Sequence, residues 1–129
     1  CVAKRLAGCG AGHEYYAVAE NGDLYPCHQF VGREDYRLGS VFTGVENMEL
    51  PTYFRNSHVL NKPLCRDCWA RFYCSGGCHA NADLFHGDIR HPYELGCEIQ
   101  KKRLECAILV QAVLALEQEE VQEDARKRA

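Results

Sequence analysis

The sequence has no excess of basic residues. Its 129 residues include 15 Lys and Arg against 18 Asp and Glu, for a formal net charge of −3. Nucleic acids and anionic lipids select basic clusters, so this balance argues against both as partners. No apolar run reaches the roughly 18 residues that cross a bilayer, and no signal-like segment precedes the cysteines, so we expect a cytoplasmic protein outside the membrane.

Long apolar periodic segments are also scarce between Gly8 and His91, where glycine, aspartate, asparagine and histidine are frequent. A segment of this kind folds poorly unless something other than an apolar core holds it together. The chain has nine cysteines, well above ordinary usage. Their odd number and CxxC-like spacing favour metal ligation in a reducing interior over a disulfide framework.

The densest cysteine run is Cys65-x2-Cys68-x5-Cys74-x3-Cys78. Four thiols in so short a stretch indicate a metal–sulfur site. The short gaps allow backbone N–H groups to turn toward bound sulfur and stabilise the charge of a thiolate-ligated cluster. Zinc also binds four thiolates and CxxC pairs, so a structural zinc site remains the alternative on spacing alone.

We predict a small α+β domain that bound metal staples together. Residues 14–19 and 23–25 read as the two strands of a β-hairpin around the tight turn at Asn21-Gly22. This hairpin would bring Cys9 and Cys27, which flank it, to the same end.

The centre of the chain reads as irregular and cysteine-rich, with short helices. The elements expected there are a short strand over 38–42, helical turns over 51–56 and 67–72, and a short helix that begins at Cys78 and ends at Gly87. A thiolate at a helix N-terminus is stabilised by the exposed N–H groups and the helix dipole.

A long helix is expected from Pro92 onward. Residues 106–116 are apolar on almost every face, unlike the single stripe of a surface helix, so we expect a missing domain or a second copy of the chain to cover them. The charged stretch from Glu117 is expected to fray. We therefore divide the chain into a cysteine-rich cluster-binding domain, 1–97, and a C-terminal helix with a charged tail, 98–129.

The whole cysteine pattern can now be read together: Cys9-x12-Gly22-x4-Cys27, then the central run, then Cys97. It resembles the seven-cysteine signature of the SPASM domain, the auxiliary-cluster domain of radical S-adenosylmethionine enzymes that modify peptides and proteins. The wording of residues 9–16 and 68–79 is similar to that of the thioether-forming maturases of six-cysteine (SCIFF) peptides. A sulfatase-maturing enzyme or a quinone-cofactor peptide maturase is the alternative branch.

The resemblance implies two [4Fe-4S] clusters with interleaved ligands. One cluster would be ligated by Cys65, Cys68, Cys74 and Cys97, and the other by Cys9, Cys27 and Cys78. The second set is one ligand short, and its open iron could take Cys1 or a substrate thiolate. Cys106, in the apolar middle of the last helix, is interpreted as a buried hydrophobe. His13, His28 and His79 lie beside ligand cysteines and are interpreted as their neighbours or as solvent-facing.

The chain contains no Cys-x3-Cys-x2-Cys motif, which the S-adenosylmethionine-cleaving cluster needs. We therefore assign it no catalytic residue and expect it to be part of a longer enzyme, in keeping with its start at Cys1. The resemblance implies that an upstream radical S-adenosylmethionine barrel abstracts hydrogen from a cysteine-containing precursor peptide. This domain would bind the substrate thiolate, relay electrons, or both, during thioether (sactipeptide-type) crosslinking.

The competing interpretation is a non-enzymatic zinc-binding interaction module whose apolar helix is the partner surface. Zinc could also occupy the thiols of an air-exposed preparation in place of the native clusters. A second copy of the chain, docked through the last helix, is a further candidate partner.

Overall fold

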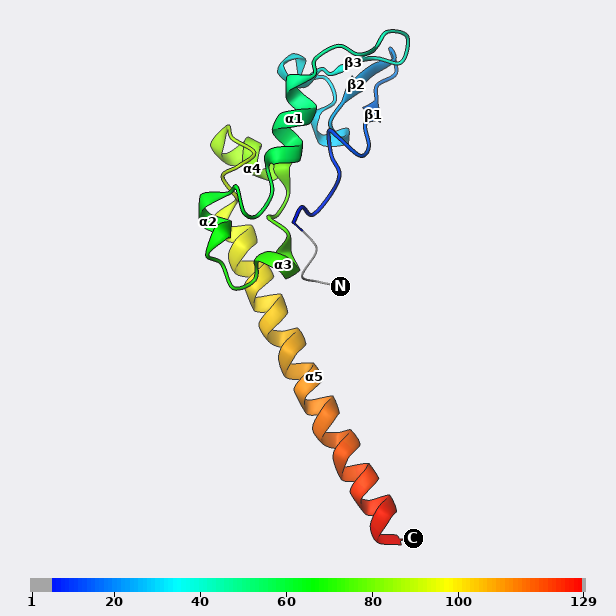
Figure 1. Cartoon of the computed structure of the whole chain (residues 1–129), viewed down its shortest axis with the longest axis vertical. Coiled ribbons are helices and arrows are strands. Elements are labelled where there is room, and N and C mark those ends of the chain that lie inside the picture. Colours follow the sequence, from blue (N-terminus) through cyan, green and yellow to red (C-terminus); the bar gives the residue numbers. More distant parts are fainter. Residues whose placement is uncertain (1–5, 129) are drawn as a thin grey trace.

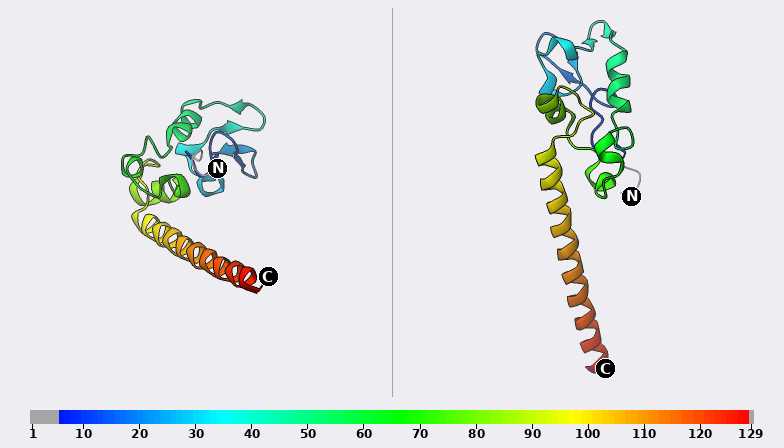
Figure 2. Two further views of the ribbon diagram at one scale, coloured as in Figure 1. Left: turned by 60° about the horizontal axis from the view of Figure 1, so that its bottom comes forward. Right: turned by 90° about the vertical axis from the view of Figure 1, so that its left-hand side faces the viewer.

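The computed structural model describes residues 6–128 and confirms a small α+β domain. Strands and short helices form a body, and one long helix extends away from it (Figure 1). Both further views show the same separation of body and helix (Figure 2). Cys1, the proposed extra ligand, lies outside the described residues.

The sheet is an antiparallel meander of four short strands in the order β1-β2-β3-β4. The predicted hairpin is confirmed: β1 (Ala17–Val18) pairs with β2 (Asp23–Tyr25), with Val18 opposite Leu24. Gly22 adopts a φ of 87°, which the tight turn requires.

Two further strands extend this hairpin. β3 (Gly39–Ser40), within the predicted 38–42 strand, pairs with β2, and β4 (Gly44–Val45) pairs with β3. Gly39 has a φ of 149°, and a Cβ there would lie 2.1 Å from the Gly44 carbonyl oxygen. Glycine at position 39 therefore permits the close approach of β3 and β4.

Short helices lie between β2 and β3 and after β4 in the sequence. They are η2 (His28–Phe30), η3 (Glu34–Tyr36), α1 (Glu49–Asn56), α2 (Pro63–Arg66), α3 (Arg71–Cys74) and α4 (His79–His86). The helical turn predicted over 51–56 is found within α1. The turn predicted over 67–72 is wrong, because Pro63 at the first helical position starts α2 earlier and Arg71 starts α3 later.

The helix predicted from Cys78 is confirmed as α4. Cys78 is its N-cap in an extended conformation, and Gly87 ends it with a φ of 67°. This is the usual use of glycine after the last helical residue.

The last helix, α5, runs from Glu94 to Arg128. It continues through the charged segment from Glu117, where fraying was expected. Its apolar middle is exposed: Ile108, Leu109 and Val110 retain more than half of their accessible surface. The described chain therefore leaves this surface uncovered, and its cover by a missing domain or a second copy of the chain stays a prediction. Among residues 6–128, no helix combines the length and the apolar character needed to cross a bilayer.

The core is small and aromatic. Phe54 on α1 is completely buried, and its ring lies 5.5 Å from that of Phe30 and 5.4 Å from that of His79, both edge-to-face. Burying one phenylalanine stabilises a fold by about 2–3 kcal/mol. The core thus joins α1 to η2 and α4, which directly follow Cys27 and Cys78.

Candidate metal centre

All eight cysteines in the described part of the chain are free thiols, and seven of them gather into two groups. We name them by size. The four-thiol group is Cys65, Cys68, Cys74 and Cys97. The three-thiol group is Cys9, Cys27 and Cys78.

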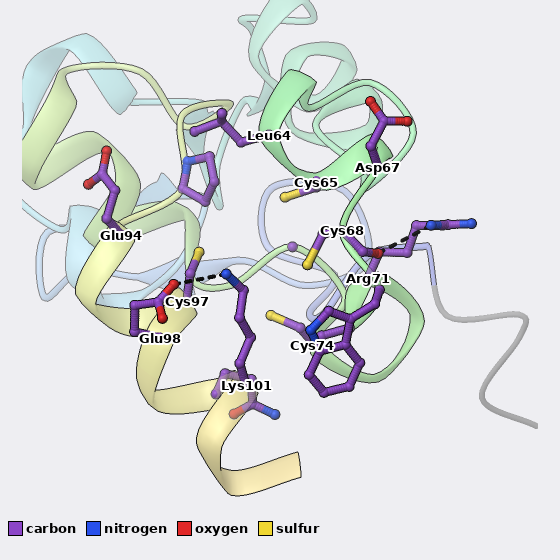
Figure 3. A pocket seen from close by; sticks show the side chains of 15 residues that line it. Leu64, Cys65, Asp67, Cys68, Arg71, Cys74, Glu94, Cys97, Glu98 and Lys101 are labelled. Atoms are coloured by element: carbon purple, nitrogen blue, oxygen red, sulfur yellow. Dashed lines mark hydrogen bonds and ion pairs between the residues drawn. The ribbon is translucent and has the colours of Figure 1, made fainter. Parts of the chain in front are cut away.

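The four-thiol group lines one cavity of about 470 Å³. The side chains of Cys65, Cys68 and Cys74 enter it from the segment of α2 and α3, and Cys97 enters it from the first turns of α5 (Figure 3). Trp69, Leu64 and Pro92 add an apolar lining. An apolar wall around a thiolate site limits solvent access and influences its reduction potential.

Burial and mutual proximity shape the acidity of these thiols. The pKa of Cys65 is raised to about 11, chiefly by burial, with the nearby Cys97 and Cys74 contributing to the increase. Burial also raises the pKa of Cys97, with Cys74 adding to the increase. Thiols held close together in a low-dielectric site need a cation to become thiolates together, and bound metal supplies that charge.

The distances between the cysteine sulfurs bear on whether they would hold a single metal ion or a larger cluster. Among residues 6–128, no three cysteine sulfurs lie within 4.8 Å of one another. Four sulfurs at about 2.3 Å from one tetrahedral zinc would lie only about 3.8 Å apart. The four-thiol group is therefore spread more widely around its cavity than a single zinc ion requires.

The three-thiol group lies where the hairpin, the loop before it and α4 meet. Cys27 follows β2, and the Gly12 N–H donates to the Pro26 carbonyl oxygen at 3.0 Å, which holds the loop of Cys9 beside it. Burial raises the pKa of the Cys27 thiol, Cys78 and Cys9 raise it further, and the backbone N–H groups of Gln29 and Phe30 lower it. Backbone N–H groups thus face this sulfur, which stabilises a thiolate there.

Exposure distinguishes the two groups. Cys9 and Cys78 are exposed, whereas Cys65 is buried and the others of the four-thiol group are partly covered. A second cavity, of about 410 Å³, opens beside Cys9 and is lined by Leu6, His13 and Glu14 among others. The three-thiol group is therefore the more accessible of the two to an outside ligand.

The turn between Cys74 and Cys78 sends these two cysteines to different groups. Ser75, Gly76 and Gly77 adopt φ values of 60°, 90° and 72° in succession. Left-handed residues reverse the chain direction, and glycine adopts this conformation at little cost. The Ser-Gly-Gly sequence therefore explains locally how two cysteines four positions apart diverge.

The histidines beside the cysteines form hydrogen bonds within the protein. Nε2 of His79 donates to the Ser57 carbonyl oxygen at 3.0 Å, and burial lowers the pKa of this side chain to about 4. Nδ1 of His13 lies 3.2 Å from the Ala11 carbonyl oxygen. Cys106 is exposed on α5 rather than buried, so its interpretation as a core residue is wrong.

One cluster of donors without cysteine was not predicted. The ligand atoms of His86, His91 and Glu94 lie within 4.8 Å of one another. Glu94 already accepts hydrogen bonds from both histidines, at 2.9 Å and 3.1 Å. These exposed contacts tie the end of α4 to the start of α5, one turn before Cys97.

Fold and thiol groups together define a small cysteine-rich domain suited to hold inorganic centres. Comparison with known proteins is consistent with this class: residues 9–69 match the model of the SPASM family, described as an iron-sulfur cluster-binding domain. The matched segment is a little under half of the chain and includes Cys9, Cys27, Cys65 and Cys68. It supports an iron–sulfur cluster-binding domain of the SPASM type. A search of curated proteins found no match.

Proposed function

We propose that this chain is the auxiliary domain of a radical S-adenosylmethionine peptide-modifying enzyme. In this proposal the four-thiol group and the three-thiol group each hold a [4Fe-4S] cluster. The observation that carries it is the division of seven cysteines into two separate groups, in a chain whose residues 9–69 match an iron-sulfur cluster-binding family. Thiolates are the standard ligands of such clusters.

The four-thiol group fits a fully ligated cluster. Four cysteines line one cavity of about 470 Å³, and the other residues that line it are partly apolar. A cluster held there would supply one-electron transfer, and the protein would contribute charge balance and exclusion of water. We assign this group the role of an electron relay.

The three-thiol group fits a site that takes an external ligand. Two of its three cysteines are exposed, and a cavity opens beside Cys9. The thiolate of a cysteine-containing precursor peptide is the chemically matched fourth ligand, because it belongs to the same ligand class as the other three. Binding there would keep the substrate sulfur deprotonated and positioned for thioether formation.

The partners proposed are this precursor peptide and an upstream radical S-adenosylmethionine barrel, which would bind the S-adenosylmethionine. The exposed apolar surface of α5 supports a protein neighbour, because Ile108, Leu109 and Leu116 retain more than half of their accessible surface. The barrel or a second copy of the chain would cover it. Cluster chemistry of this kind suits a reducing cytoplasm.

Removal of one ligand tests the proposal. We expect anaerobically reconstituted wild type to contain iron and sulfide for two clusters, Cys97→Ala to retain about half, and Cys106→Ala to retain all. Cys106 is the matched control because it is an exposed cysteine of the same helix outside both groups. The measurements are iron and sulfide content and absorption near 400 nm.

A colourless protein with bound zinc and no sulfide would overturn the proposal in favour of the zinc module. An unchanged iron content in Cys97→Ala would show that the four-thiol group is not a ligand set. The air-exposed protein should be measured in parallel, since zinc bound only after exposure to air would be a substitute for the native centre.

A further inference from the structure

Lys62 is buried against the turn that separates the two thiol groups. It caps the start of α2, three residues before Cys65, and retains only 1 % of its accessible surface. Lysine is almost never fully buried unless it is paired. The position therefore needs an explanation beyond packing.

The immediate surroundings of the ammonium group give it little compensation. Nζ donates to the Gly76 carbonyl oxygen at 3.0 Å, and this is the one hydrogen-bond acceptor that the described residues offer it. An ammonium group has three donors. No carboxylate forms an ion pair with Lys62 among the salt bridges of the described residues. Burial accordingly lowers the pKa of Lys62.

Cysteines of both groups oppose this effect when they are ionised as metal ligands. Cys65 and Cys74 of the four-thiol group, and Cys9 and Cys78 of the three-thiol group, each raise the pKa of Lys62. In the reverse direction, Lys62 lowers the pKa of Cys65. The contacts of Lys62 agree with this: its carbonyl oxygen accepts from the Cys65 N–H at 3.0 Å, and its ammonium donates to Gly76, in the turn that separates the two groups.

This inference rests on the proposed function, since it concerns clusters held by the two groups. We propose that Lys62 is the shared countercharge of the two thiol groups, and that its buried ammonium sets the reduction potentials of both bound clusters together. Reduction adds one electron to a cluster, and a nearby cation stabilises the more negative state. Water screens this charge little because the side chain is buried.

Lys62→Met tests the inference, because methionine has a similar length and no charge. We expect the midpoint potentials of both clusters to become more negative. At the wild-type midpoint, the reduced-to-oxidised ratio should fall at least tenfold, which equals about 59 mV for a one-electron couple. The full chain, reconstituted anaerobically, is titrated with redox dyes while absorption and electron paramagnetic resonance are recorded.

Two further variants separate charge from packing. Lys62→Arg keeps the positive charge and should keep both potentials near those of wild type. Lys102→Met removes an exposed lysine paired with Glu105 at 2.6 Å and should change neither potential. The shift in Lys62→Met should also persist at high salt, unlike the effect of an exposed charge.

The outcomes distinguish this inference from the function on which it rests. Wild type without iron and sulfide would overturn the proposed function and the inference with it. Loaded clusters whose potentials in Lys62→Met equal those in Lys102→Met would overturn the inference alone, as would a shift of only one cluster. Failure of both Lys62→Met and Lys62→Arg to load clusters would also overturn it. Lys62→Arg keeps the positive charge, so its failure would show that charge is not what the site requires at this position.

Discussion

Asp83 connects the helix after Cys78 to the segment after Cys27, and its loss should destabilise the domain. It lies on α4 with 6 % of its surface exposed. Its carboxylate accepts hydrogen bonds from the Tyr36 hydroxyl and from Nη1 of Arg33. Burial and the bond to Asp83 raise the pKa of Tyr36, so its hydroxyl stays protonated and donates.

The cost of Asp83→Ala follows from these two contacts. Without its acceptor, the buried Tyr36 hydroxyl is left unsatisfied, which costs about 1–3 kcal/mol. The ion pair with the partly exposed Arg33 adds about 1 kcal/mol at most. A total of about 1–4 kcal/mol should lower the thermal midpoint of a domain of this size by about 4 °C or more.

The assay is thermal unfolding of the cluster-loaded protein by circular dichroism. Asp35→Ala is the matched control, because Asp35 also pairs with Arg33, at 3.2 Å, but with 65 % of its side chain exposed. An exposed pair of this kind contributes less than about 1 kcal/mol. Asp83→Asn should fall between the two variants, since an amide oxygen can still accept from Tyr36. If Asp83→Ala and Asp35→Ala melt at the same temperature, the account of this buried contact is wrong.

Two other predictions concern the sheet and the metal. Gly39→Ala should lower the free energy of unfolding by several kcal/mol, because the new Cβ would lie 2.1 Å from the Gly44 carbonyl oxygen. Gly32→Ala, with no atom within 4 Å of the new Cβ, should lower it by only about 1–2 kcal/mol through backbone strain. Chemical denaturation compares the two variants. Removal of bound metal should unfold most of residues 9–97, because ligation energy is largely folding energy in a small metallo-domain. Hydrogen exchange would detect this as lost protection of the Leu38 amide, which donates to the Leu24 carbonyl oxygen at 2.8 Å, and retained protection would contradict it.

Local rules account for the parts of the fold that the sequence predicted well. Asn21-Gly22 places a tight turn between two β-prone stretches, and Cys78 and Gly87 bound α4 through N-cap and left-handed C-cap preferences. Each of these features depends on a few neighbouring residues. The prediction of a helical turn over 67–72 was wrong because of a local signal too: Pro63 is a stronger helix start, and α2 begins there.

The spacing of the cysteines by itself indicated a metal–sulfur site and, through the family resemblance, a division into four and three. Only the tertiary structure decided that Lys62 is buried against the turn that separates the two groups, that Asp83 meets Arg33 and Tyr36 about 50 positions away, and that Cys106 is exposed. Burial and long-range pairing depend on which distant segments pack together. No local pattern around a lysine or an aspartate encodes that information, because the same residue types stand on solvated surfaces in most proteins.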